Sequence, residues 1–209
     1  TESRGLGDVY KRQVQIGLDF GLTPAAVFGQ RDHKGVWRII HEIVTYDMGL
    51  ERFAILLKED INRFFPKHDI VVFGDPAGSQ RSTLNEDTSF DHLKTHGILA
   101  KPCATNNFKT RREALAMPMT RLIDGEPGFR IDRKCVRLRK SLAGGYHFKR
   151  VAIGAGQERF KDTPNKNEHS HIGDAAQYCL LGSEYRTMTR GKSRQLQPMV
   201  AKIDFDPLA

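Results

Sequence analysis

The sequence predicts an α/β domain whose mixed sheet has three antiparallel strands and then parallel strands, flanked by helices. Three observations support this fold class. Residues 14–21 alternate apolar and polar side chains with the period of a strand. Residues 25–46 hold two further strand-like segments around a polar turn, which is typical of a hairpin. A helical pattern over 50–64 then precedes an apolar run at 70–73, and this strand–helix–strand order favours parallel strands joined by a right-handed crossover.

The elements of the first half follow from local patterns. The second arm of the hairpin, residues 36–46, is rich in β-branched and aromatic residues, which favour strands. Residues 70–73 form an unbroken apolar run, typical of a central strand buried on both faces. Between them, Pro66 ends an amphipathic helix. Its apolar stripe is Leu50, Phe53, Ala54, Leu57, Ile61 and Phe64.

The middle of the chain predicts a polar loop at 79–89, a short helix at 90–96 and a strand at 98–101. A longer helix is predicted over 108–123. The residues expected on its apolar side are Leu115, Met119, Leu122 and Ile123. Three arginines of this helix, Arg111, Arg112 and Arg121, are expected to face solvent.

The last part of the chain predicts a brief strand and a short helix up to Leu142, then a strand at 146–153 with no identified partner, and an exposed loop at 160–167. A final helix begins near His169, and its apolar stripe must pack on the sheet. The stripe consists of Ile172, Ala175, Ala176, Cys179 and Leu180. After Gly182 the sequence becomes polar and basic and loses its periodicity.

Composition and length indicate one globular domain. The chain has 209 residues, of which 39% are hydrophobic and 28% charged. Its longest apolar runs, such as residues 53–57, are far shorter than the roughly 20 residues that span a bilayer. Three widely spaced cysteines suggest neither a disulfide framework nor a zinc site. We therefore expect a cytoplasmic protein without a membrane partner.

The charge favours a polyanionic partner. Lys and Arg number 33 against 25 Asp and Glu, which gives a formal charge of +8 and a pI near 9.5. The alternative explanation is that the positive charge serves only to keep the protein soluble. The distribution supports a partner, because eight of these cations lie within residues 130–150. They are Arg130, Arg133, Lys134, Arg137, Arg139, Lys140, Lys149 and Arg150.

The domain is expected to span residues 14–183. Residues 1–13 carry no periodic pattern and resemble translated adapter sequence, so we interpret them as a non-native or disordered leader of a chain whose N-terminal part is missing. Residues 184–209 are interpreted as a basic C-terminal tail.

Three acids are the candidates for chemistry. Asp19 and Asp75 each end a predicted strand, and parallel strands bring their carboxyl ends to one edge of a sheet. Asp174 lies on the final helix, packed against them. Such carboxylates are hard oxygen ligands for Mg²⁺ or Mn²⁺, and two ions between them can support phosphodiester hydrolysis. The alternative is three acids that serve separately in turns and helix caps.

His171 precedes Asp174 by three residues, so both side chains project to the same side of the helix. A role beside the metal ions and a role as a helix-terminal cap or surface residue both fit this position.

Three motifs together resemble the nuclease domain of the large terminase subunit of tailed bacteriophages, particularly the headful-packaging type. They are residues 17–25 (GLDFGLTPA), 72–78 (VFGDPAG) and 167–178 (NEHSHIGDAAQY). The first two are weak singly, whereas the third is distinctive. The resemblance covers most of residues 14–182 and implies a ribonuclease H-like fold.

The resemblance also implies a site and partners. Asp19, Asp75 and Asp174 correspond to the metal-binding catalytic acids, and His171 matches a histidine near the two Mg²⁺ or Mn²⁺ ions. The substrate would be double-stranded concatemeric phage DNA in the cytoplasm of the infected bacterium. The expected DNA contacts are Arg137, Arg139, Lys140, Lys149 and Arg150. The portal protein and the small terminase subunit are implied partners, with the tail as the portal-docking element.

The family pattern is incomplete here, because no Gly-x-x-x-x-Gly-Lys-[Ser/Thr] phosphate loop of the ATPase domain occurs. Translocation therefore cannot be assigned to these residues. Three other functions stay open: a junction resolvase or ribonuclease H acting on cellular nucleic acid, an actin-like nucleotide-binding domain, and a non-catalytic docking module for DNA or the procapsid. Preference for four-way junctions would identify the resolvase, and stabilisation by ATP would identify the actin-like domain.

Overall fold

A six-stranded mixed sheet organises the protein, and the computed structural model describes residues 13–21, 23–80, 87–152 and 158–190 of it. The strand order is β5-β4-β1-β2-β3-β8. Strands β1, β2 and β3 pair antiparallel, whereas β4 runs parallel to β1, β5 to β4 and β8 to β3. The predicted order of antiparallel and then parallel strands is therefore confirmed. The strands are β1 Gln13–Asp19, β2 Ala25–Arg31, β3 Trp37–Val44, β4 Asp69–Gly74, β5 Ala100–Pro102 and β8 Phe129–Ile131.

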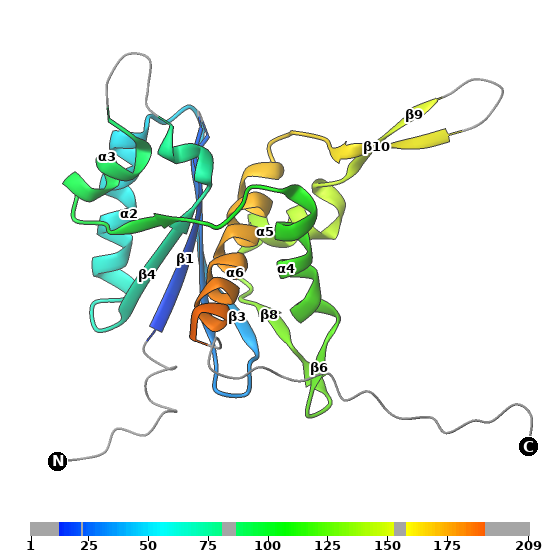
Figure 1. The fold of residues 1–209 in the computed structure, drawn as a ribbon, viewed down its shortest axis with the longest axis horizontal. Helices are drawn as coiled ribbons and strands as arrows, with labels where there is room; N and C mark the ends of the chain where they lie inside the picture. Colours follow the sequence, from blue (N-terminus) through cyan, green and yellow to red (C-terminus); the bar gives the residue numbers. More distant parts are fainter. Residues whose placement is uncertain (1–12, 22, 81–86, 153–157, 191–209) are drawn as a thin grey trace, which may run out of the picture.

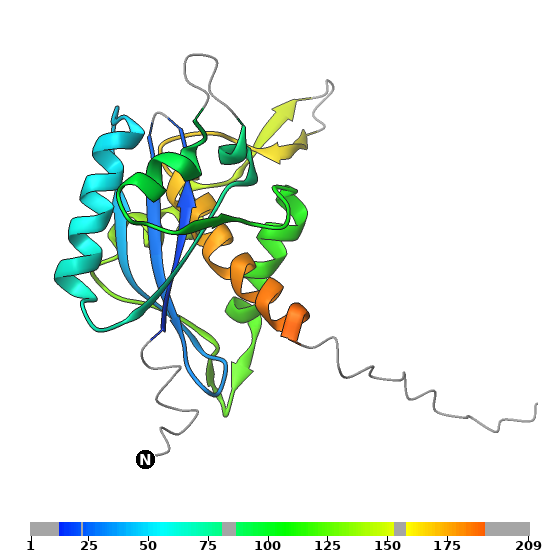
Figure 2. The same ribbon diagram turned by 60° about the vertical axis from the view of Figure 1, so that its left-hand side comes forward.

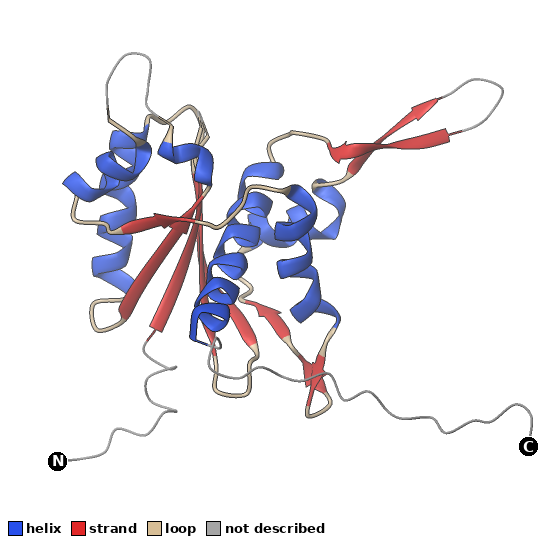
Figure 3. Ribbon diagram, viewed as in Figure 1, coloured by secondary structure: helices blue, strands red, loops and turns tan. Residues whose placement is uncertain are grey.

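Helices cover both faces of this sheet (Figures 1 and 3). Helices α2 (Leu50–Phe64) and α3 (Ser89–Thr95) lie on one face. Helices α4 (Phe108–Thr120), α5 (Val136–Lys140) and α6 (Ser170–Arg190) lie on the other. Figure 2 shows α6 crossing the sheet on the side opposite α2. None of the helices in these described segments is long and apolar enough to cross a bilayer.

The alternation in β1 decides which layer each residue enters. Val14, Ile16 and Leu18 are fully buried in the core beneath α2 and α3. The intervening residues Gln15 and Gly17 face α6. A Cβ atom on Gly17 would lie 2.1 Å from the carbonyl oxygen of Ala175 and 2.2 Å from the amide nitrogen of Cys179. Gly17 thus lets α6 approach the strand closely, which places the start of α6 at the end of β1.

Three residues assigned to the apolar sides of the predicted helices are exposed. Phe64, the last residue of α2, is 47% exposed, whereas the other residues of the predicted apolar stripe are buried or partly buried. Helix α4 stops at Thr120, and Leu122 enters a small hairpin of β6 (Leu122–Ile123) and β7 (Glu126–Pro127). Met119 and Leu122 are exposed there, because the buried face of α4 is the one that carries Arg111, Ala114 and Leu115.

A second hairpin corrects the prediction of a loop over 160–167. Strand β9 (Phe148–Ala152) pairs antiparallel with β10 (Glu158–Pro164), so residues 160–164 are the missing partner of the predicted strand at 146–153. This hairpin projects away from the sheet, at the upper right of Figure 1. Residues 159–163 are exposed on both faces, and such a strand lacks the alternation by which strands are recognised.

The remaining boundaries differ by a few residues. Strand β5 begins two residues later than the predicted 98–101 segment, because Ile98 is held in the turn that follows α3. Short helical turns occupy 76–79 (η1, Pro76–Ser79) and 141–145 (η2, Ser141–Gly145). The backbone of α6 continues to Arg190, eight residues past the point where periodicity is lost. The leader up to residue 12, residues 81–86 of the polar loop and the tail from 191 lie outside the described residues.

Candidate active site

Two of the three predicted acids end neighbouring strands. Leu18 pairs with Gly74 in the parallel register of β1 and β4, and Asp19 and Asp75 are the next residues of the two strands. The amide of Asp75 donates a hydrogen bond of 3.2 Å to the carbonyl of Leu18. This pairing is the geometry that the strand–helix–strand order predicts, because parallel strands share a carboxyl edge.

Asp19 contacts His171 at the start of α6. The Asp19 Oδ2 and His171 Nδ1 atoms are 2.9 Å apart, and Asp19 is only 6% exposed. Burial raises the pKa of Asp19 and the charge of Asp174 adds to this effect, although the hydrogen bond from His171 opposes it. The same hydrogen bond raises the pKa of His171. The contact fixes Nδ1 of the imidazole on the carboxylate and leaves Nε2 as the nitrogen that can face a substrate.

Asp174 is almost fully buried, at 1% exposure, and is surrounded by partners. Its Oδ1 atom accepts a hydrogen bond of 2.9 Å from the Tyr146 hydroxyl and lies 2.7 Å from Arg111 Nη1. Its Oδ2 atom pairs with Lys166 Nζ. A buried carboxylate is costly unless paired, and here two cations offset its charge.

Arg111 corrects the expectation that all three arginines of α4 face solvent. Arg112 and Arg121 are exposed, but Arg111 is 7% exposed. Its guanidinium lies 5.1 Å from the centroid of the Tyr178 ring and 5.4 Å from that of Phe108. The helical spacing could have indicated the burial of Arg111, since residue 111 shares a helix face with the buried residues 114 and 115.

Asp75 is linked to this network through Tyr178. Its Oδ1 atom accepts a hydrogen bond of 2.9 Å from the amide of Ala77 and so caps η1. Burial raises the pKa of Tyr178, and a hydrogen bond to Asp75 contributes to that rise. Tyr178 therefore joins Asp75 to Arg111, and Arg111 in turn contacts Asp174.

The three acids and His171 thus gather around the ends of β1, β4 and the first turns of α6. They do not form a closed ligand set: over the described ranges, no three His, Cys, Asp or Glu side chains stand close enough to hold a metal ion together. Four residues of this cluster were not predicted as site members, namely Arg111, Tyr146, Tyr178 and Lys166. Lys166 was placed in an exposed loop, and nothing in its local sequence indicates its contact with Asp174.

The predicted DNA-binding cations all lie on the surface. Arg137, Arg139 and Lys140 are exposed on α5, and Lys149 and Arg150 are exposed on β9. Glu42 of β3 accepts hydrogen bonds of 2.8 Å from the amides of Arg137 and Leu138, which anchors the start of α5.

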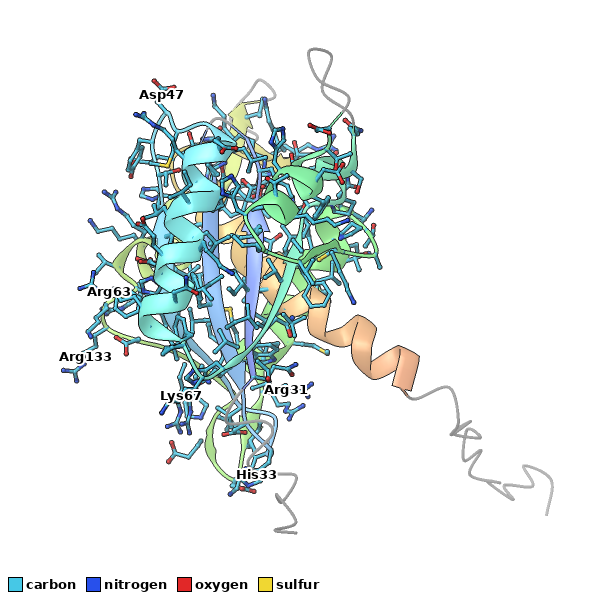
Figure 4. The ribbon with its side chains drawn as sticks, turned by 90° about the vertical axis from the view of Figure 1, so that its left-hand side faces the viewer. Arg31, His33, Asp47, Arg63, Lys67 and Arg133 are labelled. Carbon is cyan, nitrogen blue, oxygen red and sulfur yellow. The ribbon has the colours of Figure 1, made fainter. Side chains whose placement is uncertain are left out.

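The 130–150 window does not form one surface. Figure 4 looks onto α2 and shows Arg133 projecting outward at the margin of that face. Strand β9, by contrast, belongs to the projecting hairpin on the other side of the sheet.

Comparison with known proteins finds likeness in structure and not in sequence. No protein-family model and no curated protein matches the chain. The nuclease domain of the large terminase of bacteriophage SPP1, a structure with bound Mn, superposes with a TM-score of 0.54 at 18% identity, over 87% of this chain and 93% of that one. The nuclease domain of the P22 large terminase gives 0.58 at 14% identity, over 83% and 82%.

The large terminase of bacteriophage HK97 gives a TM-score of 0.50 at 14% identity, over 82% of this chain but 39% of that one. At identities this low, the structural likeness shows a shared fold and nothing more. Together with the mixed sheet and its flanking helices, it confirms the ribonuclease H-like fold that the sequence motifs implied.

Proposed function

We propose that this chain is the nuclease domain of a large terminase subunit, a metal-dependent endonuclease that cuts double-stranded concatemeric phage DNA during headful packaging. The observation that carries the proposal is the contact of Asp19 with His171, beside the buried Asp174, at the carboxyl edge where Asp75 follows the neighbouring strand. The likeness in fold to two terminase nuclease domains supports the same assignment.

The residues of the site fit divalent metal ions in their chemistry. Asp19, Asp75 and Asp174 offer the hard carboxylate oxygens that Mg²⁺ and Mn²⁺ prefer, and two such ions would activate the attacking water and stabilise the leaving oxygen. Asp174 already attracts two cationic side chains. Asp174 would hold a metal ion through Oδ2, the oxygen that pairs here with Lys166, a side chain that is 63% exposed.

The chain's other residues orient these acids. Asp19 would be the central metal ligand, and it also holds the imidazole of His171 by its Nδ1 atom. The Tyr146 hydroxyl and the Arg111 guanidinium fix the carboxylate of Asp174. The exposed cations of α5 and β9 would bind the DNA backbone, which positions the duplex without reading its sequence. The predicted binders are Arg137, Arg139, Lys140, Lys149 and Arg150.

The packaging role brings further proposed partners. An N-terminal ATPase domain would supply translocation, and the small terminase subunit and the portal protein would bind the assembled motor. The cytoplasm of the infected bacterium is the corresponding location.

Replacing Asp19 with Asn tests the proposal. We expect Asp19→Asn to abolish Mn²⁺-dependent cleavage of supercoiled plasmid, because the amide removes the central negative charge while keeping the shape of the side chain. Asp47→Asn is the matched control, since Asp47 is exposed and has a left-handed backbone (φ 46°) that Asn also tolerates. Normal cleavage by a folded Asp19→Asn protein, checked by circular dichroism, would contradict the assignment.

The choice of substrate separates the terminase role from the resolvase alternative. The wild-type protein is expected to cut linear duplex as readily as a four-way junction of the same sequence. A large preference for the junction, measured with labelled substrates under single-turnover conditions, would instead assign the site to junction resolution.

A further inference from the structure

We propose that the pocket between the start of α4 and the β9–β10 hairpin binds the unpaired bases of single-stranded DNA by stacking them on its phenylalanines. The inference rests on the proposed function for the identity of the polymer. It adds a binding site for a frayed or newly cut strand, separate from the acids that would cut it.

The pocket has a volume of about 690 Å³ and is lined by aromatic rings from three elements. Phe108 comes from the first turn of α4, Phe148 from β9 and Phe160 from β10. The Phe108 and Phe148 rings meet edge to face with centroids 5.8 Å apart, and Phe160 is 55% exposed. Its volume lies within the roughly 300–1,000 Å³ of small-molecule sites, which is large enough for a nucleobase.

Cationic side chains stand on both walls of the pocket. Lys109 and Arg112 come from α4, and Lys161 comes from β10. The lining contains one acid, Asp162, which lies 3.6 Å from Arg159, so its charge is offset. Among the described residues no acid pairs with Lys109 or Lys161. Positive charge along a groove with exposed rings is how proteins bind single-stranded nucleic acid, because the cations follow the phosphates and the rings stack with the bases.

The pocket adjoins the candidate active site through α4. The Phe108 ring lies 6.3 Å from the ring of Tyr146, whose hydroxyl bonds Asp174. One helical turn after Phe108, Arg111 contacts both the Phe108 ring and the Asp174 carboxylate. A strand with one phosphate at the acids can therefore extend its next bases toward the pocket. Figure 1 shows the base of the hairpin beside the first turn of α4.

The Phe160→Ala variant tests this site by binding alone. Affinity is measured by fluorescence anisotropy in EDTA with a labelled short oligothymidine, so that no cleavage occurs. We expect the variant to bind the oligomer about tenfold more weakly, the loss that stacking of one base represents. It should bind duplex DNA as the wild type does. Phe64→Ala is the matched control: Phe64 is 47% exposed with Arg63 at 5.2 Å from its ring, much as Arg150 lies 5.4 Å from Phe160.

Three further measurements distinguish binding by stacking from binding by apolar contact or by charge. Phe160→Trp should retain affinity, whereas Phe160→Leu should lose it, because leucine has no π face. A 2-aminopurine base in the oligomer should be quenched on binding to the wild type but not to Phe160→Ala. An oligomer of abasic sites, which keeps the phosphates, should bind the wild type and Phe160→Ala alike.

Equal affinity of the wild type and Phe160→Ala for the oligothymidine would overturn the inference. So would wild-type binding of the abasic oligomer at the oligothymidine's affinity, or an equal loss from Phe64→Ala. These outcomes are independent of the nuclease proposal. If the wild type stacks bases in the pocket but fails to cut duplex DNA with Mn²⁺, the proposed nuclease function fails and the pocket stands. If it cuts duplex but Phe160→Ala binds normally, only the pocket fails.

Discussion

At the scale of single residues, Arg111 is the most informative side chain in the site. It is an arginine on a helix, yet it is buried between the rings of Phe108 and Tyr178 and paired with an equally buried Asp174. A buried pair of this kind adds little net stability, because the desolvation of both charges offsets their attraction. Its effect is to hold the carboxylate of Asp174 in one place.

Removing one partner of this pair should lower the free energy of unfolding by far more than the intact pair adds to it, because the other charge stays buried without its partner. We expect Arg111→Met to lower the free energy of unfolding by about 3–5 kcal/mol, because Asp174 would keep only Lys166 and Tyr146 as partners. Urea denaturation followed by circular dichroism measures the change. The control, Arg52→Met on the exposed face of α2, should stay within about 0.5 kcal/mol of the wild type. A loss from Arg111→Met no larger than the control's would show that the ion pair is not formed.

At the scale of elements, the short helix α5 depends on a strand that is distant in the sequence. Its own N-cap position, Cys135, makes no side-chain hydrogen bond to the helix. Glu42 of β3 takes that role, accepting 2.8 Å hydrogen bonds from the amides of Arg137 and Leu138. A carboxylate at a helix N-terminus also complements the helix dipole. Glu42 therefore sets the orientation of a helix that carries three of the proposed DNA contacts.

Removing the Glu42 carboxylate should weaken both stability and DNA binding. We expect Glu42→Ala to cost about 1–2 kcal/mol of unfolding free energy, as the loss of a helix cap does. Duplex affinity should fall as well, since Arg139 and Lys140 would be presented by a poorly held helix. Denaturant melts and anisotropy titrations provide the two readouts, and Glu59→Ala on the exposed face of α2 is the control. If Glu42→Ala melts like that control, α5 does not depend on the cap.

At the scale of the whole molecule, α6 brings the site together. It packs across β1 on one face of the sheet and delivers His171 and Asp174 to the end of that strand (Figure 2). Residues 172–182 are buried throughout, so this part of the helix is covered on all sides, by the sheet, α4 and α5 among others. The position of the acids relative to one another is therefore a property of the layer packing.

A side chain at Gly17 should disturb that packing. The Cβ of Gly17→Ala would lie 2.1 Å from the backbone oxygen of Ala175, and backbone cannot turn aside as a side chain can. We expect the free energy of unfolding to fall by about 1–3 kcal/mol or more. In a chain of this size, each kcal/mol lowers the melting temperature by about 2–4 °C. Gly49→Ala is the control, because nothing lies within 4 Å of its Cβ. Equal melting temperatures for the two variants would contradict the close approach of α6.

Local pattern was sufficient where burial sets the spacing of the apolar side chains. Strand β1, helix α2 and strand β4 were predicted almost to the residue, because alternation, helical spacing and an unbroken apolar run each reflect burial directly. Strand β10 was missed for the opposite reason: it lies in an exposed ribbon, where neither face is selected to be apolar. Arg111 was misplaced because its cost of burial is offset by a residue 63 positions away, and no local pattern records that partner.

The sequence by itself determined the fold class and the meeting of Asp19 and Asp75 at one edge of the sheet, because each strand and the carboxylate that ends it are visible in the local pattern. It also determined that His171 and Asp174 share one side of the final helix. Only the tertiary structure decided what surrounds those acids. Arg111, Tyr146 and Lys166 converge on Asp174 because α4, the segment before the hairpin and the segment after it all pack around the start of α6. Ion pairs between residues far apart in the sequence depend on how the elements pack, and the periodicity of a single element does not reveal that packing.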